Sequence, residues 1–179
     1  MSAHSPFEYL REIEARTLTD SAGLPAGEDQ RKTWTGVGFW VGQQALLAPL
    51  DDVVEIFSVV QYTRVPNAVP WFRGLGNVRG NLVPVTDFDH YLNGQRADTT
   101  SSTRIIVFRD EGVNAGLMVS GVLGIRHFKM DETVERSRHL NEHLDDCVAH
   151  AFRRSGKHCD VFRFDKLADC DRFVQIFID

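Results

Sequence analysis

The histidines near residue 140 have the spacing that most resembles the metal ligands of an enzyme active site. His139, Glu142 and His143 follow the pattern H-x-x-E-H, in which one class of zinc peptidase binds its metal with two imidazoles. On a helix both histidines would share a face with Cys147. A peptidase also needs a third protein ligand, normally a downstream glutamate, and no glutamate follows His143. We therefore expect no peptidase, and a small metal-binding protein using this helix remains only a distant alternative.

The cysteines and serines carry no catalytic pattern. Cys147, Cys159 and Cys170 are three in number and show no C-x-x-C spacing, so structural disulfides are not expected. No G-x-S-x-G elbow is present, and nothing around a thiol indicates an activated nucleophile. The sequence therefore gives no support for a thiol or serine enzyme.

Three glycines, Gly74, Gly76 and Gly80, give a segment flexible enough to wrap a phosphate. Their spacing is G-x-G-x-x-x-G, and the segment leads into an expected strand, Leu82–Val85. Phosphate cradles lead into a helix N-terminus instead. We interpret the segment as a rigid turn that holds Arg79 outward, because glycine permits positive φ. A guanidinium held in this way suits carboxylates of a partner protein.

Composition narrows the class of protein. Of 179 residues 42% are hydrophobic, and 25 acids against 20 bases give a net charge of -5. The chain can therefore bury a core, and its charge disfavours nucleic-acid binding. No apolar run is long enough for a membrane span, and the N-terminus lacks the pattern of a secretory signal. We expect a cytoplasmic protein.

The elements that must position these residues are mostly short strands separated by turns, which predict a barrel or sandwich and disfavour a parallel α/β sheet. Strands are expected at 37–41, 45–50, 82–85, 104–108, 115–119, 122–128, 161–164 and 173–178. Helices are expected from Ser5-Pro6 to about residue 21, from Asp51 through Phe57, and at Glu135–Arg153. Leu24–Lys32 is expected to be a linker.

Three ordered segments resemble the CheW family. They are Val53-Val54-Glu55-Ile56, Thr63-Arg64-Val65-Pro66 and the stretch from Pro70 to Phe88, which contains Asn77-Val78-Arg79-Gly80 and Val83-Pro84-Val85-Thr86-Asp87. The resemblance runs from about Trp34 to the C-terminus. The segments Trp34–Phe39, His127-Phe128 and Asp171–Phe173 are most similar to the family branch that serves type IV pili.

This resemblance implies a mainly β fold in which residues 33–179 form two intertwined, five-stranded SH3-like barrels, preceded by a helix and linker at 1–32. It implies a non-catalytic adaptor without a cofactor, which couples the cytoplasmic tip of a methyl-accepting receptor to the regulatory domain of a CheA-type histidine kinase. The expected setting is type IV pilus twitching motility, with a flagellar chemotaxis array as the alternative. The protein would lie in the cytoplasm at membrane receptor arrays, without inserting into the membrane or binding nucleic acid.

The resemblance also implies a set of partner-binding residues, which match family positions associated with receptor and kinase coupling. They are Arg79, Gly80, Asn77, Gly74, Val53, Glu55, Thr103, Arg104 and Ile125. The alternative for Val53 and Ile125 is plain core packing. Ser120 and Arg104 depart from the family pattern, which has Asp and an apolar residue at these positions.

Overall fold

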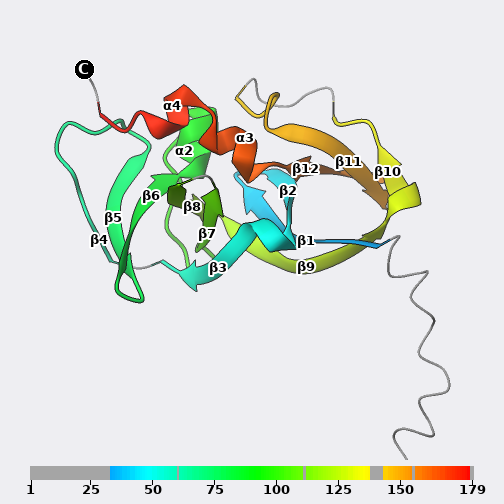
Figure 1. Ribbon diagram of the computed structural model, residues 1–179, viewed down its shortest axis with the longest axis horizontal. Coiled ribbons are helices and arrows are strands. Elements are labelled where there is room, and N and C mark those ends of the chain that lie inside the picture. The colour runs from blue at the N-terminus through cyan, green and yellow to red at the C-terminus, as the bar shows by residue number, and fades with distance from the viewer. Residues whose placement is uncertain (1–32, 60, 111, 138–142, 155, 178–179) are drawn as a thin grey trace, which may run out of the picture. The chain divides into compact units, whose positions relative to one another are not determined.

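The part of the chain that the structure describes is a small β protein with a few short helices (Figure 1). The computed structural model describes residues 33–59, 61–110, 112–137, 143–154 and 156–177. From Trp34 onward the chain forms one compact unit. The expected N-terminal helix and linker at 1–32 lie outside the described residues. Within the described part, every helix is too short or too polar to cross a membrane.

The strands form two sheets of six. The first runs in the order β10 (Thr133–Val134), β11 (Val148–Arg154), β12 (Lys157–Phe162), β2 (Gln44–Pro49), β1 (Thr33–Val41) and β9 (Gly121–Lys129). The second runs in the order β3 (Val53–Ser58), β7 (Arg104–Asp110), β8 (Val113–Val119), β6 (Asn81–Asp87), β5 (Phe72–Val78) and β4 (Tyr62–Thr63). The first sheet therefore combines strands from both ends of the described chain, while the second is continuous in sequence.

Each sheet curls until strands far apart in its order meet. In the second sheet, Glu55 on the edge strand β3 forms an ion pair with Arg79 in the β5–β6 turn. In the first sheet, Nη2 of Arg154 on β11 lies 2.6 Å from the carbonyl oxygen of His127 on β9, although three strands separate β11 and β9 in the sheet order. Curling of this kind is what an SH3-like barrel requires. The expected mainly β, two-subdomain fold is confirmed, and each sheet has six strands because it gains a two-residue strand, β4 or β10.

A shared apolar core joins the two sheets. Phe39 on β1, Phe108 on β7 and Leu117 on β8 belong to one buried cluster. Three short helices complete this cluster: α2 (Phe88–Asn93), α3 (Phe164–Ala168) and α4 (Asp171–Val174). Phe164 stacks on Phe108 with 4.7 Å between ring centroids. Burial of each phenyl ring contributes about 2–3 kcal/mol, so this core stabilises both sheets together.

The helix expected at Glu135–Arg153 is wrong. Residues 143–147 lie in turns, and Val148–Arg154 is the strand β11, which pairs with β12. Gly156, with φ 76°, helps to turn the chain between the two strands. Residues 138–142 lie outside the described part. The charged residues of this stretch favoured a helix locally, but pairing with β12 buries Ala151 and Phe152, and that gain outweighs helix propensity.

Two other expected elements are also corrected. The helix expected from Asp51 through Phe57 is a 3-10 turn, Leu50–Asp52, followed by β3, which pairs with β7. The β-branched residues of β3 suit a strand. The strand expected at 173–178 is not formed by the described residues. Asp171–Val174 is the helix α4, and beyond it Phe177 forms an isolated β-bridge with Ala68. The apolar and aromatic residues of this segment favoured a strand, but Phe173 is buried in the shared core as part of the helix α4.

Candidate functional site

The glycine-rich segment is a strand ending in a two-residue turn, whereas the sequence predicted one longer turn. Phe72–Val78 is β5, and Val78 pairs with Asn81 across Arg79 and Gly80. Both turn residues have positive φ, 50° at Arg79 and 87° at Gly80, as tight hairpins with a twist matching their strands require. The side-chain oxygen of Asn77 accepts a 2.8 Å hydrogen bond from the backbone N–H of Gly80. The turn is thus locked from inside, and Arg79 is held at its tip.

Gly74 has a different task in the same hairpin. It has φ 133° and lies at an irregularity in the β5–β6 ladder. A Cβ at this position would overlap the backbone carbonyl of Thr63 on β4. Gly74 therefore allows β4 to approach β5 closely, and its expected part in partner binding stays a prediction.

The ion pair between Glu55 and Arg79 is the centre of the candidate site. The Arg79 side chain is 76% exposed, and the Glu55 side chain 27%. Val54, which lines the same small hollow as the pair, is exposed as well. We call these three residues the Glu55–Arg79 surface. Exposed charge beside exposed apolar side chains is the composition of a protein-binding surface.

A buried ion pair anchors the base of the hairpin. Nη2 of Arg73 on β5 lies 2.6 Å from Oδ2 of Asp87 at the end of β6, and both side chains are buried. Asp87 also accepts hydrogen bonds from the backbone N–H groups of His90 and Ala97, so it caps α2 as well. Sequence reasoning missed this pair as a support of the site. The capping pattern of Asp87 directly before Phe88 was the signal that could have located it.

The other predicted partner-binding residues are not part of this surface. Thr103 is buried, and its hydroxyl accepts a 2.8 Å hydrogen bond from the N–H of Thr100. Arg104 donates to the carbonyls of Ser101 and Thr103, so both residues order the loop before β7. The roles expected for them in coupling stay predictions.

Val53 and Ile125 have opposite surroundings. Val53 packs against the shared core, as the plain-core alternative expects. Ile125 lies on β9 of the first sheet and is 53% exposed, which contradicts a core role. A partner contact by Ile125 would therefore belong to a different face from the Glu55–Arg79 surface.

In the described part of the histidine-rich stretch, residues 143–147 lie in turns and do not form the helix that the metal site would need. His143 lies in a turn and Cys147 is buried in the shared core, while His139 and Glu142 lie outside the described residues. Burial raises the pKa of the Cys147 thiol to about 12, which disfavours a thiolate ligand. Within the described ranges, no three His, Cys, Asp or Glu side chains gather in a manner suited to a metal.

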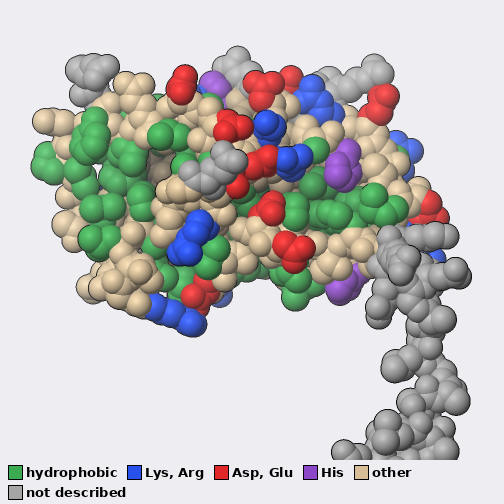
Figure 2. Space-filling model, viewed as in Figure 1, with side chains coloured by type: hydrophobic (Ala, Val, Ile, Leu, Met, Phe, Trp, Pro, Cys, Tyr) green, Lys and Arg blue, Asp and Glu red, His purple; other side chains and the backbone are tan. Residues whose placement is uncertain are grey.

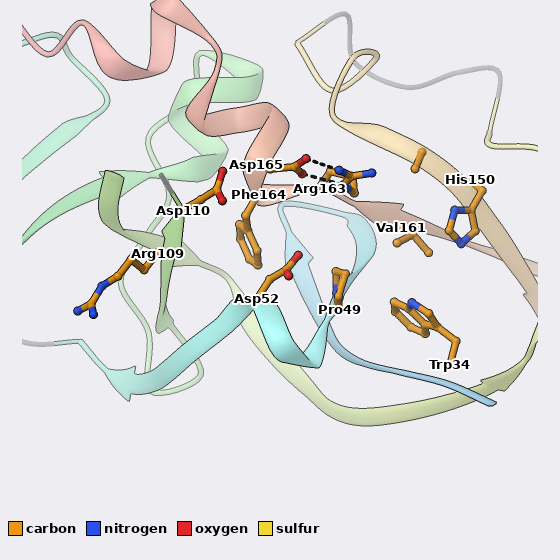
Figure 3. A pocket seen from close by; sticks show the side chains of 11 residues that line it. Trp34, Pro49, Asp52, Arg109, Asp110, His150, Val161, Arg163, Phe164 and Asp165 are labelled. Carbon is orange, nitrogen blue, oxygen red and sulfur yellow. Dashed lines mark hydrogen bonds and ion pairs between the residues drawn. The ribbon is translucent and has the colours of Figure 1, made fainter. Parts of the chain in front are cut away.

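A cleft of about 490 Å³ opens beside α3 and the 3-10 turn (Figure 3). At one end Asp52, Asp110 and the ion-paired Asp165–Arg163 approach one another, and at the other Trp34 and His150 form a wall. It has no Ser, Thr, Cys or Lys in its lining. The residues described around the cleft therefore offer it no hydroxyl, thiol or amine nucleophile.

Asp52 and His150, at opposite ends of this cleft, have shifted pKa values. Burial, reinforced by the charge of Asp165, raises the pKa of Asp52. Burial, reinforced by the charge of Arg163, lowers the pKa of His150.

The face of the molecule seen in Figure 2 carries two kinds of surface. Charges of both signs are mixed over the α3 and α4 region, whereas hydrophobic side chains gather at the β4–β5 end.

Comparisons with known proteins agree with this geometry. The family model described as CheW-like domain matches residues 35–170. Protein PilI of Pseudomonas aeruginosa is 33% identical over 150 residues, which are 84% of each chain. Chemotaxis protein CheW of Helicobacter pylori is 27% identical over 62% of this chain and 66% of its own. The crystal structure of the scaffolding protein TtCheW from Thermoanaerobacter tengcongensis superposes with a TM-score of 0.64 at 20% identity, covering 73% of this chain and 88% of that one.

The two curled sheets with an exposed, charged hairpin tip define a two-subdomain β protein. The family match spans well over half of the chain and includes the whole hairpin from β5 to β6. The chain belongs to the CheW-like domain family.

Proposed function

We propose that this protein is a non-catalytic adaptor that couples a methyl-accepting receptor to a CheA-type histidine kinase. Membership of the CheW-like family supports this, as does the similarity to relatives named chemotaxis protein and scaffolding protein. The similarity to PilI favours a system controlling type IV pilus twitching motility. A flagellar chemotaxis array is the second candidate, because several relatives are named CheW. The protein would act in the cytoplasm beneath receptor arrays and needs no cofactor.

The observation that carries the proposal is the exposed pair of Glu55 and Arg79. A guanidinium has five N–H donors, so Glu55 leaves several of them available to a partner. An exposed ion pair contributes only about 0–1 kcal/mol to stability, so a partner carboxylate can replace Glu55 at little cost. The locked turn keeps the guanidinium near its binding position, which reduces the entropy lost on association.

The affinity that such a surface provides is modest. A micromolar dissociation constant corresponds to about 8 kcal/mol, and contacts by exposed charges weaken as salt rises. Arrays compensate because many copies bind side by side at a high effective concentration. We therefore expect micromolar, salt-sensitive binding to the regulatory domain of the kinase and to the receptor tip.

Calorimetry with the cognate kinase regulatory domain and a receptor cytoplasmic fragment tests the proposal. Arg79→Glu should weaken binding to at least one partner by about tenfold, a loss of about 1.4 kcal/mol. Arg153→Glu is the matched control, since Arg153 is another exposed arginine and lies on β11 of the first sheet. If the wild-type chain binds neither partner, the adaptor function is wrong. Twitching and swimming assays of a deletion strain then distinguish the two systems.

A further inference from the structure

A second cleft lies in the first sheet, and its lining combines apolar side chains with cationic ones. It encloses about 330 Å³ between β2, β9 and the β11–β12 hairpin. Its walls are largely apolar, and three cations surround them. The lining residues are Ala45, Leu46, Leu47, Leu123, Arg126, Phe128, Arg154, Lys157 and Cys159. Neither the Glu55–Arg79 surface nor the cleft of Figure 3 shares any of these residues.

Two glycines let β9 present its side chains to this cleft. Strand side chains normally alternate between faces, yet Leu123, Arg126 and Phe128 all line the cleft. The alternation is broken at Gly124, which has φ 83°. On the neighbouring strand, a Cβ at Gly38 would lie 3.1 Å from Cβ of Leu123, so glycine gives Leu123 and the stem of Arg126 room to lie over β1.

The three cations around the cleft are held differently. Arg154 is engaged already, because it lies over the Phe128 ring at 4.5 Å and pairs with Glu132 at 3.1 Å. Arg126 and Lys157 are exposed, and neither has an ion pair with another described residue. The cleft therefore combines a fixed cationic wall with two cations that are open to an anionic ligand.

We propose that this cleft binds an acidic peptide segment of a partner protein, with a large apolar side chain seated between Leu47, Leu123 and Phe128. The apolar walls would bury a Leu or Phe side chain, and burial of such a side chain is favourable by about 1.5–3 kcal/mol. Arg126 and Lys157 would contact carboxylates on either side of it. In a chain with net charge -5, a local excess of unpaired cations around an apolar cleft selects a ligand of the opposite sign.

Titrations of the full chain with three capped hexapeptides, followed by two-dimensional amide NMR at low salt, test this inference. The probe has Leu-Phe flanked by two glutamates on each side. One control peptide has lysines in place of the glutamates, and the other has Ser-Gly in place of Leu-Phe. We expect the probe to shift amides of β2, β9 and β12 around Leu47, Leu123 and Cys159, and both control peptides to bind more weakly.

Single charge reversals identify the cations involved. Arg126→Glu and Lys157→Glu should each weaken binding of the probe by about threefold or more, as expected for exposed charge contacts. Arg96→Glu should leave the affinity unchanged. Equal binding of the lysine peptide, or shifts centred on the Arg79 hairpin, would overturn the inference. Concentration-dependent shifts without peptide would also overturn it, because they would assign the cleft to a second copy of this chain.

Discussion

Glu55 and Arg79 form an ion pair, although β7 and β8 lie between β3, which carries Glu55, and the β5–β6 hairpin, which carries Arg79, in the hydrogen-bond order of the second sheet. The pair exists because the sheet curls on itself around a small core containing Val83, Val107 and Met118. Its surroundings differ from those of the second ion pair of this hairpin, Arg73–Asp87, which is buried.

Loss of the buried pair should destabilise the fold far more than loss of the exposed one. Asp87→Ala leaves the Arg73 guanidinium buried without its counter-charge, which costs about 3–5 kcal/mol. Arg79→Ala should change the free energy of unfolding by less than about 1 kcal/mol. Urea denaturation followed by tryptophan fluorescence measures both. Equal effects of the two substitutions would contradict the assignment of Arg73–Asp87 to structure and Arg79 to binding.

Gly74 and Gly80 should respond differently to alanine, although both have positive φ. At Gly80 a Cβ meets nothing within 4 Å, so Gly80→Ala should cost only the strained backbone, about 1–2 kcal/mol. At Gly74 the Cβ also overlaps the Thr63 carbonyl, and β4 must move. We expect Gly74→Ala to cost at least about 3 kcal/mol. Thermal unfolding of the two variants side by side checks the order, and a Gly80→Ala variant that is the less stable would reverse it.

Removal of the Asp52 charge should stabilise the protein at neutral pH. Its pKa is raised on folding, mainly by burial, so the folded state disfavours the ionised form. The penalty is absent below the ordinary pKa near 3.8 and develops as pH rises through the folded pKa. Asp52→Asn should therefore raise the free energy of unfolding at pH 7 by about 0.5 kcal/mol, a small effect because solvent screens this group.

The pH dependence provides the check on this assignment. The gain from Asp52→Asn should shrink as the pH is lowered from 7 toward 4, in chemical denaturation at several pH values. Asp98→Asn, at an exposed aspartate outside the cleft, serves as the control. A gain that does not depend on pH would show that the change acts through packing.

Cys147 should resist alkylation in the folded protein. Its pKa is raised to about 12, and the thiolate is the reactive form. Iodoacetamide at pH 8, followed by peptide mass spectrometry, should leave Cys147 unmodified in native buffer and modify it in urea. Because the folded pKa lies above the ordinary value of 9.0, stability should fall as pH rises above 9. Rapid native alkylation of Cys147 would place it outside the core.

The hairpin shows how far sequence reasoning reached. The order of the motifs and the type of residue at position 79 were sufficient to predict a turn presenting an arginine. The partner of that arginine was not evident, because Glu55 lies on a strand that meets the turn only after the sheet curls. Asp87 was similarly visible as a polar residue at the end of a strand, while its buried bond to Arg73 depends on the paired register of β5 and β6.

The sequence by itself determined the mainly β class, the positions of strands such as β1, β2, β7 and β8, and the residues at the hairpin tip, because these follow from local alternation and turn chemistry. Tertiary structure alone decided that Val148–Arg154 is a strand, that Glu55 meets Arg79, and that Leu123, Arg126 and Lys157 surround one cleft. The physical reason is the same in each case. Pairing and burial between residues distant in the chain outweigh local propensity, and the pattern of a single segment carries no record of which distant segment it will meet.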